Sequence, residues 1–264
     1  MLITDQIGHQ IELETAPKRI VSLVPSQTEL LSYLGLEDEV VGITKFCVHP
    51  KSWFQSKTRV GGTKKIHHDR IKDLEPDLII GNKEENTKED IQSLQNKYPV
   101  WTSDIKTIED AINMIKAIGQ VTTQQAKANQ LTKQIQNKIK KLKRSKSRQL
   151  RVAYLIWKEP IMGVGTDTYI HNFLETLGFQ NALKSYSRYP QLSISALKKA
   201  KPDYIFLSSE PFPFKNKHKT LFTDVLPLEN VLIIDGEAFS WYGSRMLSGI
   251  EYTRKLYESI IIAE

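Results

Sequence analysis

The chain has 264 residues, of which 25% are charged and 40% are hydrophobic, and its mean hydropathy is −0.37. This composition is typical of a soluble folded protein and excludes a collagen, a coiled coil or a long disordered region. No stretch approaches the ~18 consecutive apolar residues of a membrane-spanning helix. The N-terminus lacks the basic and apolar regions of a secretory signal. The single cysteine, Cys47, excludes an internal disulfide framework.

The net charge of +7 comes from one segment. Between residues 111 and 158 there are twelve Lys or Arg and no Asp or Glu, and the 30 acidic residues outnumber the basic ones elsewhere. Apolar residues recur there at helical spacing, at Ala128, Leu131, Ile135, Ile139 and Leu142. The spacing predicts one long amphipathic helix. Such a helix either binds nucleic acid or an anionic membrane, or is a solvated connection between two lobes. We favour the connection, because no aromatic residues alternate with the charges.

The first half of the chain predicts a β-α-β order after an N-terminal hairpin. Glycine at Gly35 ends the first expected helix, and residues 26–29, Ser-Gln-Thr-Glu, fit a capping box at its start. Residues 86–89 predict another helix cap. The expected elements are the hairpin 2–4 and 10–13, strand 19–24, helix 29–34, strand 40–44, helix 70–74, strand 75–81, strand 99–101 and helix 107–118.

The second half repeats this organisation. The phrase Glu75-Pro-Asp-Leu recurs as Lys201-Pro-Asp-Tyr, each time between an expected helix and an expected strand. We therefore predict two similar α/β lobes with parallel sheets, residues 1–119 and 149–264, joined by a helix over 120–148. A ligand cleft between the lobes is expected, with small rearrangement on binding. The expected elements are strand 150–157, helix 169–177, helix 193–199, strand 201–207, strand 230–234 and helix 244–260.

Motifs for catalysis are missing from the sequence. It contains neither a glycine-rich phosphate-binding motif nor the Gly-x-Ser-x-Gly nucleophile turn, and nothing groups Asp, His and Ser as a triad. Cys47 and His49 form a candidate soft-metal pair. A buried thiol with a turn histidine before Pro50 is the alternative that we favour. His67 and His68 indicate an exposed loop.

Aromatic residues crowd several expected loops, including Trp157, Phe212 and Phe214. The segment 239–245, Phe-Ser-Trp-Tyr-Gly-Ser-Arg, lies between a strand end and a helix start, where loops often carry function. Its apolar faces suit a large, flat ligand. Arg245 either meets an anionic substituent of that ligand or packs against its own lobe.

Four segments, 17–31, 34–44, 60–63 and 74–80, resemble in this order the helical-backbone substrate-binding proteins of ABC importers. These proteins capture cobalamin, ferric siderophores or haem. The chain is most similar to the cobalamin-binding branch, with which it shares a Pro-x-x-Thr-Glu-Leu helix start at 25–30 and the loop ending at Pro50. The resemblance implies two Rossmann-like lobes on one long helix, capture of a corrinoid first and of a ferric siderophore or haem next, and no enzymatic activity. It also implies an extracytoplasmic monomer that serves an ABC permease, without nucleic acid or a membrane span.

The resemblance also implies roles for particular residues. Phe46 and Tyr189 fall at aromatic ligand contacts, Met162 lies near an apolar one, and Thr63 stands where that branch has a tryptophan. Asp69 matches an acidic residue that docks on the permease, and Ser195 falls at the second docking position. The full set of predicted ligand-binding residues is Phe46, Cys47, His49, Thr63, Lys64, Trp157, Met162, Tyr189, Phe239, Trp241, Tyr242 and Arg245.

Two alternatives remain open on the same fold. The missing second docking charge and the missing signal are compatible with a cytoplasmic protein, if Met1 is the native start. That protein would be a chaperone or sensor that handles a metal or a tetrapyrrole through Cys47 and His49. The other alternative is a chelatase-like enzyme.

Overall fold

The computed structural model of the chain describes residues 1–142 and 149–263, and these fold into two compact α/β units. Unit 1 comprises Met1–Asp104, Glu109–Gln134 and Tyr242–Arg245. Unit 2 comprises the described residues of Ile105–Ile108, Ile135–Trp241 and Met246–Glu264. Residues 105–108 and 242–245 thus belong to the unit opposite to the one that the predicted boundaries give them. None of the helices in the described residues is long and apolar enough to cross a membrane.

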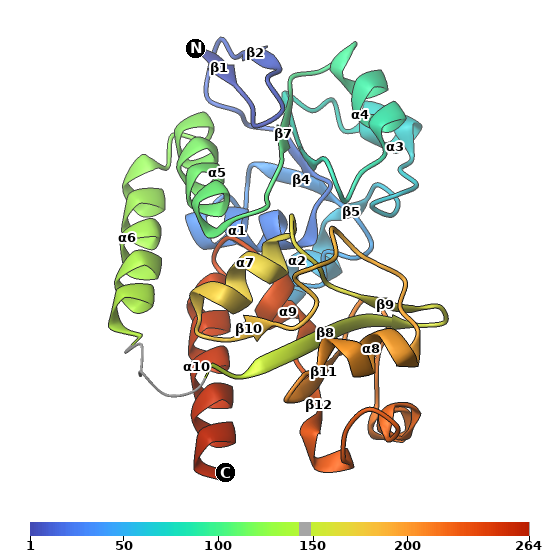
Figure 1. Cartoon of the computed structure of the whole chain (residues 1–264). Coiled ribbons are helices and arrows are strands. Elements are labelled where there is room, and N and C mark those ends of the chain that lie inside the picture. The colour runs from blue at the N-terminus through green and yellow to red at the C-terminus, as the bar shows by residue number, and fades with distance from the viewer. Residues whose placement is uncertain (143–148, 264) are drawn as a thin grey trace. The chain divides into compact units, whose positions relative to one another are not determined.

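Unit 1 contains a five-stranded parallel sheet in the order β5-β4-β3-β6-β7 and a separate antiparallel hairpin, β1-β2 (Figure 1). Its strands are β1 (Leu2–Thr4), β2 (Gln10–Glu12), β3 (Ile20–Ser22), β4 (Val40–Ile43), β5 (Thr58–Arg59), β6 (Leu78–Asn82) and β7 (Val100–Ser103). Its helices are α1 (Pro25–Leu34), α2 (Lys51–Ser56), α3 (His68–Asp73), α4 (Lys88–Gln95) and α5 (Ile108–Val121), followed by the first part of α6 (Gln125–Lys141). The predicted hairpin and parallel strands are confirmed, whereas the sequence analysis missed α2 and β5.

The core of unit 1 follows from the alternation of side chains along its strands. On one face, Val21 and Ile79 pack with Ile71 of α3 and with Ile91 and Leu94 of α4. α1 and α5 lie on the other side of the sheet (Figure 1). Strands that are apolar on both faces are typical of parallel sheets covered by helices on both sides.

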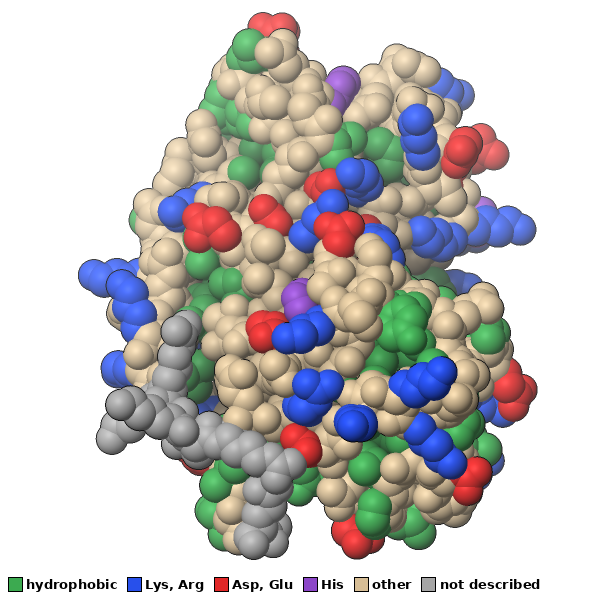
Figure 2. Space-filling model, viewed as in Figure 1, with side chains coloured by type: hydrophobic (Ala, Val, Ile, Leu, Met, Phe, Trp, Pro, Cys, Tyr) green, Lys and Arg blue, Asp and Glu red, His purple; other side chains and the backbone are tan. Residues whose placement is uncertain are grey.

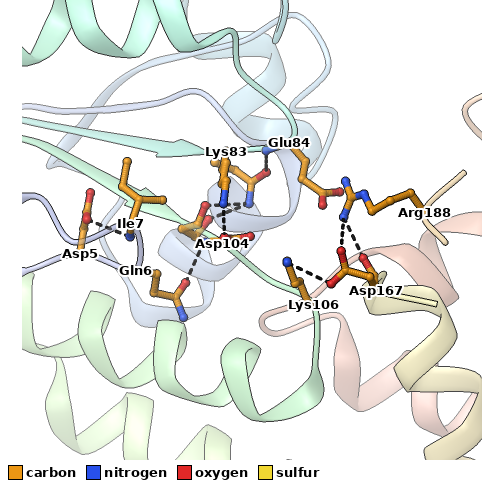
Figure 3. Close-up of polar contacts among 11 residues, drawn as sticks. Asp5, Gln6, Ile7, Lys83, Glu84, Asp104, Lys106, Asp167 and Arg188 are labelled. Atoms are coloured by element: carbon orange, nitrogen blue, oxygen red, sulfur yellow. Dashed lines mark hydrogen bonds and ion pairs between the residues drawn. The ribbon is translucent and has the colours of Figure 1, made fainter.

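Polar side chains fasten the hairpin to the edge strand β7 (Figure 3). The Asp5 carboxylate accepts the amides of Ile7 and His9 at 3.0 and 2.7 Å, and that of Thr102 at 3.1 Å. Gln6 accepts the amide of Asp104 at 3.2 Å. Backbone donors at a sheet edge need partners. These contacts give partners to the amides of Thr102 and Asp104 and hold the hairpin against β7.

The predicted connecting helix is shorter than expected. Residues 120–121 end α5, the chain turns through Thr123 at φ +57°, and α6 begins at Gln125. α5 and α6 approach closely, since a Cβ on Gly119 would lie 2.3 Å from that of Ala128. The predicted stripe is buried at Ala128, Leu131 and Ile135, and lysine side chains project from the exposed face of the helix (Figure 2). The last part of the prediction, 143–148, lies outside the described residues.

Unit 2 contains a parallel sheet in the order β10-β8-β11-β12, with β9 antiparallel to β8 (Figure 1). Its strands are β8 (Arg151–Lys158), β9 (Ile161–Gly163), β10 (Gln180–Asn181), β11 (Tyr204–Ser208) and β12 (Val231–Ile234). Its helices are α7 (Tyr169–Thr176), α8 (Ile194–Ala200), α9 (Gly236–Ser240), α10 (Met246–Ala263) and the short 3-10 helices η1 (Asn216–Phe222) and η2 (Leu228–Asn230). The sequence analysis missed β9, β10, α9, η1 and η2.

The two faces of the unit 2 sheet bury different side chains. Leu155 and Leu207 belong to a mainly aliphatic core that includes Leu197 of α8 and the buried rings of Phe214 and Phe222. The alternate residues Tyr154 and Phe206 point into an aromatic core on the opposite face. Phe239 of α9 occupies that core, 5.5 Å from the ring of Tyr154 and 6.1 Å from that of Phe206. The predicted two-lobe α/β fold is therefore confirmed, each lobe having its own core.

The recurring Pro-Asp phrase forms the same turn in both units. Asp77 accepts the backbone amides of Lys18 and Arg19 at 2.7 and 2.8 Å, and the Arg19 guanidinium donates to the carbonyls of Leu74 and Glu75. In unit 2, Asp203 accepts the amide of Arg151 at 2.8 Å.

The Arg151 guanidinium donates to the carbonyls of Ala200 and Lys201. The residue before each proline, Glu75 or Lys201, has a positive φ, at 44° or 47°. In each unit the aspartate thus joins the starts of two neighbouring strands. The arginine donates hydrogen bonds to backbone carbonyls at the end of the helix before the turn, which have no partner within that helix.

Two predicted helix caps are wrong. α1 begins at Pro25, and its N-cap, Val24, makes no side-chain cap bond, so residues 26–29 form no capping box. Proline suits the first helical position because it has no amide that would need a partner. In α4 the N-cap is Thr87, one residue later than expected, and its hydroxyl accepts the Asp90 amide at 3.2 Å.

Candidate ligand-binding site

Each sheet has a point where the chain reverses the direction in which it adds strands. In unit 1, β4 and β5 follow β3 on one side, and the chain then returns to add β6 and β7 on the other. In unit 2 the corresponding point lies between β8 and β11. At such a switch point the connections after the two strands diverge, which opens a crevice at their carboxyl ends where ligands bind in open α/β sheets.

A buried amide network shapes the crevice of unit 1. The Asn82 side chain accepts the amides of Glu84 and Glu85 at 2.8 and 2.9 Å and donates to Ser103 Oγ at 2.9 Å. Asn86 accepts the Asn82 amide at 2.8 Å. These bonds hold the loop after β6 in one conformation. No sequence pattern predicted this network, apart from the polar residues that follow a strand.

Phe46 is the exposed aromatic residue of this crevice. It follows β4, has a relative exposure of 49%, and lies with its ring centroid 5.0 Å from Lys45 Nζ. A Cβ on Gly62 would lie 3.2 Å from Phe46 Cε2, so the missing side chain gives the ring its space. Phe46 therefore offers an apolar face to solvent at a strand end, and its role as a ligand contact stays a prediction.

The predicted neighbours Thr63 and Lys64 follow β5. Thr63 is buried, and its carbonyl accepts a bond from the Asn86 side chain at 3.0 Å. Lys64 is exposed, and its Nζ donates to the carbonyl of Glu84 at 2.5 Å. Both residues line the same loop cluster as Phe46.

Cys47 lies in the interior of unit 1. Its Sγ is 3.1 Å from the hydroxyls of both Thr28 and Thr44. Burial raises the pKa of the thiol, because the thiolate would lose its solvation. No cluster of three His, Cys, Asp or Glu side chains that could hold a metal occurs within 1–142 and 149–263. These observations favour the buried-thiol interpretation, and ligation of a metal by Cys47 and half-buried His49 stays a prediction.

The crevice of unit 2 is lined by two aromatic rings. Trp157, near the end of β8, has a relative exposure of 38%. Its ring packs edge-on against Phe212, which follows β11, with the centroids 5.5 Å apart. The fold thus brings the predicted residue Trp157 to the switch point, together with Phe212, which the sequence analysis noted without choosing it as a site residue.

Met162 and Tyr189 lie on two paired segments of unit 2. Met162, in β9, bridges to Gln191, and the amide of Gly163 donates to the carbonyl of Pro190 at 3.0 Å. Tyr189 is half-buried, with the Arg188 guanidinium 5.4 Å from its ring centroid.

Arg188 itself is held by charge and by backbone. Its Nη1 donates to the carbonyl of Asp167 at 2.8 Å, and the Asp167 carboxylate pairs with Lys106 Nζ at 3.0 Å (Figure 3). Both Asp167 and Arg188 have φ of +60°. The loop that carries Tyr189 is therefore anchored at the residue before it.

The segment 239–245 differs from the predicted loop. Phe239 belongs to α9, is fully buried and packs at the centre of the aromatic core, so its predicted place in an open loop is wrong. Trp241 is largely buried, and its indole donates to Glu210 Oε1 at 3.0 Å. The roles of Phe239 and Trp241 as ligand contacts stay predictions. Full burial does not favour a ligand contact by Phe239.

The last residues of this segment belong to unit 1. Burial raises the pKa of the Tyr242 hydroxyl, which therefore stays neutral at physiological pH. Arg245 Nε donates to Glu29 Oε2 at 2.9 Å, and both side chains are mostly buried. The packing partner of Arg245 is therefore Glu29 of unit 1, and not a residue of the C-terminal lobe to which the prediction assigned it. Contact of Arg245 with an anionic ligand stays a prediction.

Asp69 and Ser195 occupy corresponding places. Each is the second residue of the helix that precedes the Pro-Asp turn, α3 in unit 1 and α8 in unit 2, and each is exposed. The correspondence follows from the internal repeat. Their part in docking on a permease stays a prediction.

The chain is similar to a known protein family and to several of its members. The sequence profile described as "Periplasmic binding protein" matches residues 20–226. The chain belongs to this family. It is 25% identical to the uncharacterized ABC transporter substrate-binding lipoprotein YvrC of Bacillus subtilis, over 98% of this chain and 84% of that protein. It is also 25% identical to the vitamin B12-binding protein of Vibrio parahaemolyticus, over 72% of this chain and 70% of the relative.

A solved structure of a family relative shares the fold. The periplasmic vitamin B12-binding protein BtuF of Vibrio cholerae has a TM-score of 0.78 at 21% identity, covering 92% of this chain and 97% of that one. The resemblance to the substrate-binding proteins of ABC importers, stated from the sequence, is therefore confirmed.

Proposed function

We propose that this protein is the substrate-binding protein of an ABC importer and captures a metal chelate. A corrinoid such as cobalamin is the first candidate, and a ferric siderophore or haem comes next. The family, and the names of the relatives that match most of the chain, support this proposal. The protein would bind its ligand without making or breaking a bond, on the extracytoplasmic side of the membrane.

The observation that carries the proposal is an exposed aromatic side chain at the carboxyl-end edge of each sheet. This side chain is Phe46 in unit 1 and Trp157 in unit 2, and their relative exposures are 49% and 38%. Apolar faces with a few polar groups are typical of sites for bulky ligands. A corrin, a porphyrin and an aromatic siderophore all present the flat or apolar surfaces that such rings bind.

Docking on the permease is proposed for the exposed residue Asp69. An Asp69→Asn variant should bind its ligand with unchanged affinity, because Asp69 lies on α3 and not in the loops after the strands. Import by cells that carry the permease should fall. Equal import by both proteins would contradict this assignment.

Titration with three chelates tests the main proposal. Purified protein is mixed with hydroxocobalamin, haemin or a ferric hydroxamate, and binding is followed by calorimetry and thermal unfolding. A ligand at 100 times its Kd stabilises the folded state by about 2.7 kcal/mol. For a chain of this size that is a rise in Tm of roughly 5–10 °C.

Variants at exposed aromatic positions supply the control. Phe46→Ala should weaken binding of the active ligand about tenfold with little change in Tm, since the ring is half-exposed. Tyr33→Ala, which removes a ring of 41% exposure from α1, should bind like the unaltered protein. Failure of all three chelates to bind, or equal losses in the two variants, would contradict the proposal.

A further inference from the structure

The crevice of unit 2 contains more aromatic side chains than the pair at its switch point. The ring centroid of Phe212 lies 5.5 Å from that of Trp157, 4.8 Å from that of Phe214 and 5.3 Å from that of His218. The His218 ring also packs edge-on against Phe214 at 5.8 Å. We call these four residues the aromatic ledge. It joins the end of β8 to the segment that runs from β11 into η1.

Three lysines surround the ledge. Lys158 Nζ lies 5.7 Å from the ring centroid of Phe212. Lys215 and Lys217 precede His218 on the same short segment, and both are exposed. Desolvation, with Lys217, Lys158 and Lys215 in that order, lowers the pKa of His218. The same ammonium groups that oppose a positive charge on the imidazole attract a negative charge placed beside it.

The imidazole itself is neutral in this arrangement. His218 Nδ1 accepts the amide of Lys215 at 2.9 Å, so the hydrogen bond assigns the ring proton to Nε2. Lys158 pairs with Glu159 at 3.2 Å, and the Glu159 side chain is 79% exposed. A carboxylate so exposed is easily replaced as a partner by the oxygens of a ligand.

The crevice of unit 1 has a different charge pattern. There the lysines Lys45 and Lys64 share the loops with the acidic residues Glu84 and Glu85, and Lys64 donates to the Glu84 carbonyl. In unit 2 the acidic neighbours of the ledge are Glu159, which pairs with Lys158, and Glu210, whose Oε1 accepts hydrogen bonds from Ser240 and Trp241. The three lysines outnumber these two carboxylates.

We propose that the aromatic ledge and its three lysines form a subsite for a negatively charged oxygen group carried by a flat, apolar ligand. This inference rests on the proposed function and narrows its ligand class. The exposed ring of Trp157 and the half-buried ring of Phe212 cover an apolar surface of the ligand, while buried Phe214 packs against Phe212 and supports it. Lys158, Lys215 and Lys217 face the phosphate, carboxylate or phenolate oxygens of the ligand. Lysine suits such a group because its compact charge on a flexible stem adapts to differing oxygen positions. The phosphodiester of a complete corrinoid, the carboxylates of haem and the acidic groups of a siderophore share this chemistry.

Pairs of ligands that differ in the anionic group test the subsite. We would measure Kd by calorimetry for cobalamin against dicyanocobinamide, which lacks the nucleotide phosphate, and for haemin against its dimethyl ester. The test variant is Lys215→Gln/Lys217→Gln. The control is Lys198→Gln/Lys199→Gln, which removes two exposed lysines from the end of α8 next to the amino end of β11.

The test variant should bind the anionic member of one pair about tenfold more weakly, and its neutral partner unchanged. The control variant should bind both like the unaltered protein. The pair that responds identifies the source of the anionic group. If the unaltered protein binds a chelate and the lysine substitutions leave its Kd unchanged, the subsite is refuted and the proposed function stands. If neither these four compounds nor the ferric hydroxamate binds, both the proposed function and the subsite fail.

Discussion

Replacing Asp77 by alanine should destabilise unit 1, because this one carboxylate joins the starts of two strands. It accepts the amides of Lys18 and Arg19 at 2.7 and 2.8 Å across 59 and 58 residues of sequence. Hydrogen bonds to a charged acceptor contribute about 1.5–3 kcal/mol each when buried, and less where solvent competes. Since Asp77 is half-exposed, we expect a total loss of about 2 kcal/mol of unfolding free energy.

Chemical and thermal unfolding measure this loss. At roughly 2–4 °C per kcal/mol for a chain of this size, Tm should fall by about 4–8 °C. Hydrogen exchange should accelerate at the amides of residues 18 and 19, which lose their acceptor. Asp73→Ala, an exposed substitution at the end of the neighbouring helix α3, is the control and should change Tm little.

The corresponding Asp203→Ala variant should weaken unit 2 in the same way, through the amide of Arg151. If Asp77→Ala and Asp73→Ala melt within about 1 °C of each other, the turn does not fasten the sheet and the reasoning from the internal repeat is wrong.

Three more predictions concern buried or charged side chains. Cys47 should react with a thiol reagent at pH 8 far more slowly in the folded protein than in urea, because burial raises its pKa; a lower metal content in Cys47→Ala would instead support the metal-handling alternative. Phe239→Ala should cost about 3–5 kcal/mol by chemical denaturation, since the ring fills the aromatic core, and a loss under 1 kcal/mol would contradict that packing. Hydrogen bonds from Arg254 lower the pKa of Glu251, so its contribution to stability is present above the ordinary value of 4.5 and is lost as pH falls below it. Glu251→Gln should therefore flatten the acid limb of the stability profile, and an unchanged limb would refute this.

The deduction of the fold succeeded where short segments carry their own signal. Gly35 ends α1 at a φ of +84°, a conformation that glycine adopts without strain, and the spacing of the apolar residues marked the helix from Ala128 onward. The repeated Pro-Asp turn indicated two similar lobes, because a turn and its neighbouring elements lie within a few residues of each other. The order of the motifs along the chain indicated the protein family, and the family match over residues 20–226 confirmed it.

Predictions from the sequence were wrong where a side chain contacts residues that are distant in the chain. Glu29 was assigned to a local cap, whereas its partner is Arg245, 216 residues away. Phe239 was assigned to an open loop, whereas rings from β8 and β11 enclose it. Local propensity limits which conformations a segment can adopt, but burial and ion pairing depend on which other segments arrive beside it. The amino-acid sequence alone therefore determined most of the elements, their order and the family. Only the tertiary structure decided the short elements α2, β5, β9, β10 and α9, and which aromatic and charged side chains are left facing solvent at the ends of the strands.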